Sequence, residues 1–157
     1  MFIIQNHITV MKKTILSIVA LLTIVLLSSC DLESSDNGKL DGFWHLATVD
    51  SLAVQTHADM RDKRIFWSFQ HNLLELADRD FVHSPIFMRF ELIGTDTLRV
   101  NRPRFDNREE GDPEIDYEAR LYPFGVNMLD ELFVIEKLTR NKMILRSNVL
   151  RLFFEKF

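Results

Sequence analysis

The feature that most constrains this chain is a series of short stretches after residue 40 in which apolar and polar side chains alternate. Successive side chains of a strand point to opposite faces, so this alternation predicts strands that bury one face. No stretch after residue 40 keeps a 3.6-residue apolar period over several turns, as an amphipathic helix would. The chain is therefore predicted to be all-β.

The expected strands are separated by turn residues. They cover residues 42–49, 64–76, 85–93, 97–101, 131–138, 142–147 and 150–157. Residues 115–121 are a further candidate strand, and a helical turn is an alternative over 127–132. In 64–76 the apolar parity shifts, which predicts a β-bulge or bend near Asn72-Leu73. Seven or eight antiparallel strands joined in order are typical of an up-and-down barrel or a sandwich. We expect the barrel because closure removes exposed strand edges.

The first 29 residues have the pattern of a secretory signal peptide. Lys12 and Lys13 precede residues 15–27, a run in which only Ser17 and Thr23 are polar. A helix that spans a membrane needs about 20 apolar residues, whereas the apolar core of a signal peptide has about 7–15. Residues 1–29 are therefore predicted to be a signal peptide. Met11 is the better start, because it places both lysines at the N-terminus.

The predicted signal peptide is followed by a cysteine in a specific context. Leu27-Ser28-Ser29-Cys30 closely resembles the lipobox of bacterial lipoproteins. The resemblance implies that Cys30 carries fatty acids such as palmitate and anchors the mature chain in the cell envelope, at the periplasmic or surface face of the outer membrane. Residues 30–38 would then form the lipidated cysteine and an acidic tether. Acidic residues in this place also resemble the surface-export signals of some Gram-negative lipoproteins, and both interpretations stay open.

Net charge bears on the partners of the mature chain. The formal charge of −4 at pH 7 falls to −6 once Lys12 and Lys13 are removed with the signal peptide. A negative chain is not expected to bind nucleic acid or anionic lipid through its overall charge. The single cysteine excludes an intramolecular disulfide.

The mature domain, residues 39–157, resembles small lipocalin-like lipoproteins of Gram-negative gut bacteria. Gly42-Phe43-Trp44 looks like the Gly-x-Trp at the start of the first lipocalin strand. Residues 64–70, 121–126 and 143–154 also resemble that group. The resemblance implies a lipocalin-like barrel.

Two roles follow from this resemblance. Trp44 would plug the closed end of the barrel, and Arg151 from the last strand would lie across it. Strand parity, however, puts Arg151 on the face opposite Leu150 and Leu152. The long segment 53–63 between the first two strands would serve as a lid over the open end.

Apolar side chains expected to point into the barrel form the candidate ligand site. They are Trp67, Phe69, Met88, Phe90 and Met143, with Gln70 or His71 as polar groups. Such a set suits either a packed core or a cavity for an apolar molecule. The predicted function is a lipid-anchored domain that binds a small hydrophobic ligand. The alternative is a structural or interaction lipoprotein with a filled barrel.

The sequence lacks the patterns that are typical of catalytic and metal-binding sites. The chain has no Gly-x-Ser-x-Gly, no phosphate-binding loop and no Gly-rich dinucleotide turn, so no enzymatic activity and no cofactor are expected. The histidines of the mature domain lack metal-ligand spacing. Residues 106–117 resemble a calcium loop in charge, but Arg108 and Tyr117 stand where carboxylates are needed. No metal site is predicted.

Overall fold

The structure is a computed structural model that describes residues 35–157, so the predicted signal peptide and Cys30 lie outside the described residues. The strands are β1 (Gly42–Ser51), β2 (Thr56–Asp59), β3 (Ile65–Gln70), β4 (Leu73–Asp78), β5 (Ile86–Ile93), β6 (Thr97–Phe105), β7 (Glu131–Leu138), β8 (Lys142–Arg146) and β9 (Leu150–Lys156). Two 3₁₀ turns, η1 (Glu118–Arg120) and η2 (Tyr122–Phe124), precede β7. Over these residues, no helix has the length and apolar character needed to cross a membrane.

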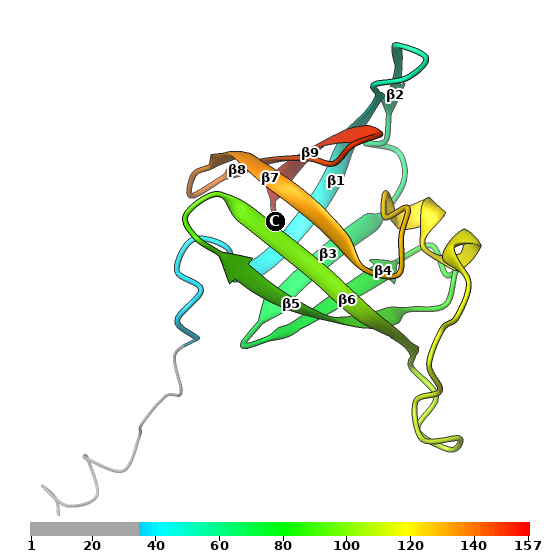
Figure 1. Cartoon of the computed structure of the whole chain (residues 1–157). Coiled ribbons are helices and arrows are strands. Elements are labelled where there is room, and N and C mark those ends of the chain that lie inside the picture. The colour runs from blue at the N-terminus through cyan, green and yellow to red at the C-terminus, as the bar shows by residue number, and fades with distance from the viewer. Residues whose placement is uncertain (1–34) are drawn as a thin grey trace, which may run out of the picture. The chain divides into compact units, whose positions relative to one another are not determined.

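Eight of these strands, β1 and β3–β9, form a closed antiparallel barrel. Neighbours in sequence are paired, and β9 returns to pair with β1 from Trp44↔Lys156 to Ser51↔Leu150. Figure 1 shows the first and last strands side by side. The predicted all-β up-and-down barrel is confirmed, and its closure leaves each barrel strand with a partner on both sides.

The segment predicted as one long strand over 64–76 is two strands. β3 and β4 pair as a hairpin whose last pair is Gln70↔Leu73, with His71 and Asn72 between them. His71 has φ of 53°, a conformation that two-residue hairpin turns need and that glycine usually supplies. The shift in apolar parity near Asn72 therefore marks a tight turn between two strands, and the prediction of a bulge or bend within one continuous strand is wrong.

The segment predicted as a loop over 53–63 contains β2. This strand pairs with the end of β1, from Thr48↔Asp59 to Ser51↔Thr56. All four residues of β2 are exposed, and Figure 1 shows the β1–β2 hairpin projecting beyond the barrel. The segment extends the sheet, and its role as a lid stays a prediction.

The β6–β7 connection is where the structure differs most from expectation. No strand forms over 115–121, where η1 lies instead, and no helical turn forms over 127–132. The second turn, η2, lies between these two segments. Leu121, Phe124 and Val126 are buried in the core. Gly125 ends η2 with φ of 82°, and a Cβ there would lie 3.0 Å from Leu152 Cδ2. The connection is therefore part of the core packing.

Candidate functional site

Trp44 anchors the end of the barrel where β1 begins. Its side chain has no exposed surface, and its Nε1 donates a hydrogen bond of 2.7 Å to the carbonyl oxygen of Leu40. Lys156 Nζ lies 4.8 Å from the centre of the Trp44 ring, within cation–π range. Gly42 has φ of 111°, and a Cβ at that position would lie 2.9 Å from Lys156 Cε. Glycine at position 42 therefore leaves room for Lys156 to reach Trp44.

The structure contradicts the predicted contact between Arg151 and Trp44. Arg151 Nε donates to Glu136 Oε2 at 2.5 Å, and Arg146 Nε donates to the other oxygen of Glu136 at 2.9 Å. The Arg151 guanidinium also lies 5.2 Å from the ring centre of Phe153. Arg151 lies on the outer face of β9, as strand parity requires, and does not contact Trp44. The cation near Trp44 is Lys156.

The aromatic side chains predicted to line a ligand cavity pack against one another. The ring centre of Trp67 lies 5.1 Å from that of Phe154 and 5.7 Å from that of Phe133. Trp67 is completely buried, and its Nε1 donates a 2.9 Å hydrogen bond to the carbonyl oxygen of Phe124. Ring centres at these distances are in direct contact. This part of the interior is filled by its own side chains.

The remaining candidates divide between core and surface. Phe69 and Phe90 meet edge to face with ring centres 5.0 Å apart, and Met88 and Met143 are also buried. His71 lies exposed in the β3–β4 turn, so its predicted place in a ligand cavity is wrong. Gln70 is exposed at the end of β3. Neither polar side chain is among the residues that form the hydrophobic core.

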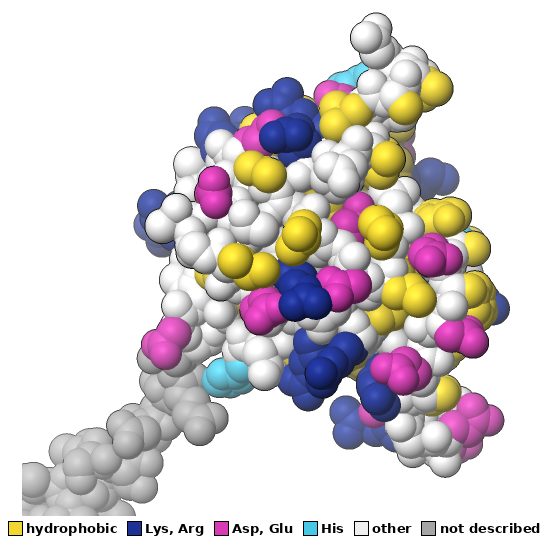
Figure 2. Space-filling view, viewed as in Figure 1, with side chains coloured by type: hydrophobic (Ala, Val, Ile, Leu, Met, Phe, Trp, Pro, Cys, Tyr) yellow, Lys and Arg dark blue, Asp and Glu magenta, His cyan; other side chains and the backbone are white. Residues whose placement is uncertain are grey.

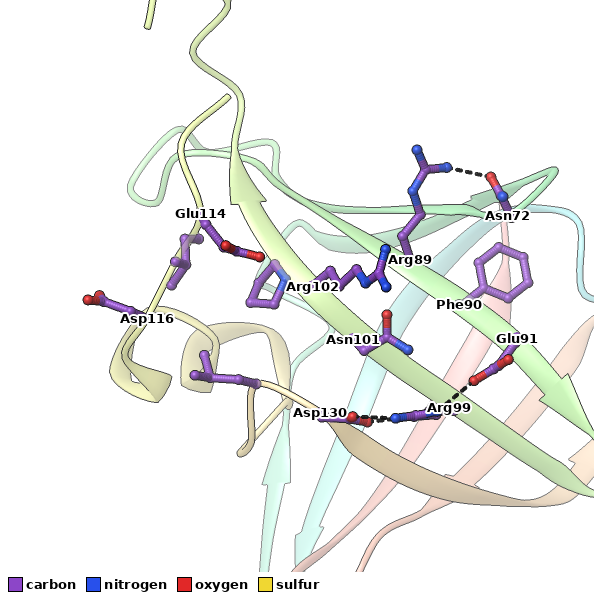
Figure 3. Close-up of a pocket in the computed structure, with 13 residues that line it drawn as sticks. Asn72, Arg89, Phe90, Glu91, Arg99, Asn101, Arg102, Glu114, Asp116 and Asp130 are labelled. Carbon is purple, nitrogen blue, oxygen red and sulfur yellow. Dashed lines mark hydrogen bonds and ion pairs between the residues drawn. The ribbon is translucent and has the colours of Figure 1, made fainter. Parts of the chain in front are cut away.

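A groove of about 1150 Å³ lies on the outside of the barrel (Figure 3). It opens where β6 and β7 separate, because these strands pair only from Thr97↔Val134 to Val100↔Glu131. Its walls are Asn101, Arg102 and Pro103 of β6 and residues of the following connection, among them Glu114, Ile115, Asp116, Leu129 and Asp130. The groove is polar and charged, unlike the apolar interior.

Arg99 occupies the part of the groove next to β7. Its guanidinium donates to both carboxylate oxygens of Asp130, at 2.8 Å and 2.6 Å, and to Glu91 at 2.9 Å. The hydrogen bonds to Asp130 and then to Glu91 raise the pKa of Arg99, and the hydrogen bond from Arg99 lowers the pKa of Asp130. The charge of Arg99 is therefore satisfied by groups of this chain.

Glu131 is a buried carboxyl next to the groove. Its Oε2 accepts backbone hydrogen bonds from Asn127 at 2.5 Å and Met128 at 3.3 Å. Burial raises the pKa of Glu131, while the hydrogen bonds from Asn127, Ser147 and Met128 act in the opposite direction. The residue holds the turn that leads into β7.

Metal coordination finds no support in the described region. Among residues 35–157, no group of three or more His, Cys, Asp and Glu side chains is arranged to hold a metal ion. The His57 ring lies 2.7 Å from the Asp50 carboxylate, and a ring nitrogen of His45 lies 2.7 Å from the carbonyl oxygen of Lys63. In the acidic loop, Asp112 accepts a backbone hydrogen bond from Asn107.

The arginines of this outer face were not predicted from the sequence as a site. Arg99, Arg102, Arg104 and Arg108 fall within ten residues, a density that could have pointed to a basic surface. The alternation of side chains along the strand does not by itself show that these arginines lie near Arg89. That requires the pairing of β5 with β6, which places Arg89 opposite Asn101.

Two solved structures resemble this barrel. One is a lipocalin-like protein from Bacteroides uniformis ATCC 8492, with 20% identity and a TM-score of 0.56 over 76% of this chain and 100% of that one. The other is an uncharacterized protein from Bacteroides eggerthii DSM 20697, with 20% identity and a TM-score of 0.50 over 74% of this chain and 98% of that one. At this identity the likeness concerns the fold. Comparison with curated proteins gives no match.

The family of this chain is shown by its match to a family profile. A family profile described as a lipocalin-like domain matches residues 25–157, most of the chain and every strand of the barrel. This match agrees with the closed antiparallel barrel, with Trp44 in its first strand. The chain belongs to the lipocalin-like domain family.

Proposed function

We propose that this chain is a lipid-anchored binding protein of the cell envelope that acts through the outer surface of a filled barrel. The observation that carries the proposal is the packing around Trp67. Its ring contacts Phe133 and Phe154, and its indole nitrogen is bonded to Phe124. A hydrophobic ligand would have to displace these side chains, whereas the groove beside β6 is open to solvent without any rearrangement.

The anchor rests on the sequence. Leu27-Ser28-Ser29-Cys30 after a short apolar run supports lipidation of Cys30 and attachment to the outer membrane. Two or three acyl chains hold a protein on a membrane far more firmly than one, because each buried CH₂ contributes about 0.8 kcal/mol. Cys30→Ser is expected to abolish metabolic labelling with palmitate and to release the protein from membranes. Continued labelling of that variant would contradict the proposed anchor.

A hydrophobic ligand inside the barrel is the second candidate function. It is favoured by the lipocalin-like family and by the aromatic character of the interior. In that case Trp67 would contact the ligand, and its fluorescence would report binding. The two functions therefore differ in what Trp67 senses.

Native mass spectrometry separates the two candidates. The full protein is purified from its host in a mild detergent, and its mass is compared before and after denaturation. We expect the acyl groups on Cys30 to be the only added mass. We also expect palmitate to leave the tryptophan emission unchanged. A non-covalently retained apolar molecule, together with a palmitate-dependent change that Trp67→Phe removes, would establish the interior site instead.

A further inference from the structure

A second groove, of about 430 Å³, lies on the outer face of β5 and β6 beside the loop that follows β6. Four arginines line it: Arg89, Arg102, Arg104 and Arg108. Among the described residues, Asp112 is the acidic residue of its lining. Leu73 and Phe87 add apolar surface. Figure 2 shows Lys and Arg side chains gathered with acidic ones over β5–β6 and toward the protruding loop.

The positive charge of this groove is poorly compensated within the chain. Arg89 donates to the neutral amide oxygen of Asn72 at 2.5 Å. Arg104 donates to the backbone carbonyl of Asp112 at 3.1 Å, and its nearest carboxylate, on Glu114, is 3.9 Å away. Within residues 35–157, the side chains of Arg102 and Arg108 have no hydrogen bond or ion pair. They differ in this respect from Arg99, which is paired with two carboxylates.

The one carboxylate of the lining is already engaged. Asp112 Oδ1 accepts a hydrogen bond of 3.1 Å from the backbone nitrogen of Asn107, within the loop itself. Its charge therefore stabilises the loop as well as offsetting the nearby arginines. The groove keeps an excess of positive charge in a protein whose net charge is negative.

A distortion of the sheet directs Arg102 into the groove. The β5–β6 register shifts between Phe87 and Arg89, so β6 carries one extra residue, with Arg102 and Pro103 opposite Met88. Arg102 lies in this bulge with φ of 52°, a conformation that costs a non-glycine residue energy. Arg89 and Arg102 line both grooves, and Figure 3, a view of the first groove, shows the two side chains on this face of β5 and β6. Such strain is found where the surrounding structure or a function requires the altered direction of a side chain.

We propose that this groove binds an organic ligand that carries two phosphate groups, through Arg89, Arg102, Arg104 and Arg108. Guanidinium groups bind phosphate oxygens through paired hydrogen bonds. Each phosphate monoester carries about −1.5 to −2 at neutral pH, so two phosphates match four arginines and one aspartate. The volume lies within the range of small-molecule sites. Phe87 and Leu73 would contact the organic part of the ligand.

This inference rests on the proposed function only in placing binding on the outside of the barrel. Calorimetric titration of the full detergent-purified protein with pyrophosphate tests it. We expect saturable binding that weakens at least about tenfold in Arg102→Gln and in Arg108→Gln, since a hydrogen bond to a charged group contributes about 1.5–3 kcal/mol. The matched control is Arg140→Gln, which removes one charge from the exposed β7–β8 turn and should bind as the unchanged protein does.

The two sources of a phosphate ligand are distinguished by a second titration. Dihexanoylglycerol pyrophosphate, a soluble lipid that carries two phosphate groups, should bind more tightly than pyrophosphate if the ligand is a lipid headgroup, and more weakly if it is a soluble phosphate. Equal binding of citrate would overturn the assignment to phosphate. Absence of pyrophosphate binding, or equal weakening in Arg140→Gln, would overturn the site. Neither outcome would show an apolar ligand in the interior, so the proposed function is tested separately.

Discussion

Replacing Trp67 with Phe tests whether the barrel is filled. The substitution removes the indole nitrogen that donates to the Phe124 carbonyl and leaves that oxygen unpaired in a residue with no exposed surface. An orphaned buried acceptor costs about 1–3 kcal/mol. The loss of ring atoms between Phe133 and Phe154 adds about 2 kcal/mol, at about 0.8 kcal/mol per buried carbon group. The expected loss is about 3–5 kcal/mol.

The assay is urea denaturation followed by far-ultraviolet circular dichroism. A domain of this size has about 5–15 kcal/mol of stability in total, so the variant should unfold at a much lower urea concentration. Phe81→Ala is the control, because Phe81 is 85% exposed and its removal should change stability little. A loss below about 1 kcal/mol for Trp67→Phe would refute the reasoning and indicate unfilled space around the ring.

Three further perturbations address single contacts. Lys156→Ala should lower the melting temperature more than Arg151→Ala, because Lys156 covers the buried Trp44 ring whereas Arg151 forms an exposed ion pair; equal effects would contradict the assigned roles. Gly42→Ala should destabilise the barrel by about 1 kcal/mol or more in chemical denaturation, given its positive φ and the 2.9 Å approach to Lys156; unchanged stability would mean that Lys156 moves freely. The pKa of Glu131 is raised in the folded state, so the folded protein binds this proton more tightly than the unfolded chain does. The free energy of unfolding should therefore fall as the pH rises above about 4.5, and Glu131→Gln should flatten this part of the pH profile.

The strands were predictable where one face is buried and the other is solvated. Alternation in residues 85–93 and 131–138 indicates β5 and β7 to within one residue. The β3–β4 hairpin was not predictable as a turn, since His71 adopts positive φ without being glycine. The η1–η2 connection was not predicted for a different reason. Leu121 and Phe124 are buried by short 3₁₀ turns, which have no long sequence period.

The candidate sites were less accessible from the sequence than the fold. Parity identified Trp67 and Phe69 as inward-facing, but whether such rings line a cavity or touch one another depends on distances across the barrel. Arg102 reaches the outer groove because of a register shift that leaves no mark in the apolar pattern. The cation over Trp44 comes from Lys156 because the antiparallel register of β9 with β1 places Lys156, the last residue of β9, opposite Trp44.

The pairing of β9 with β1 has a consequence for the order in which the protein can be made and folded. The two strands that close the barrel are the first and the last to leave the ribosome, so their contacts have the longest sequence separation in the domain. Contacts of this kind form late, because the intervening chain must be ordered first. Until Lys156 has emerged, the nascent chain lacks the complete β9, which closes the barrel against β1, and the cation over Trp44. The barrel can therefore close only when β9 is available to pair with β1.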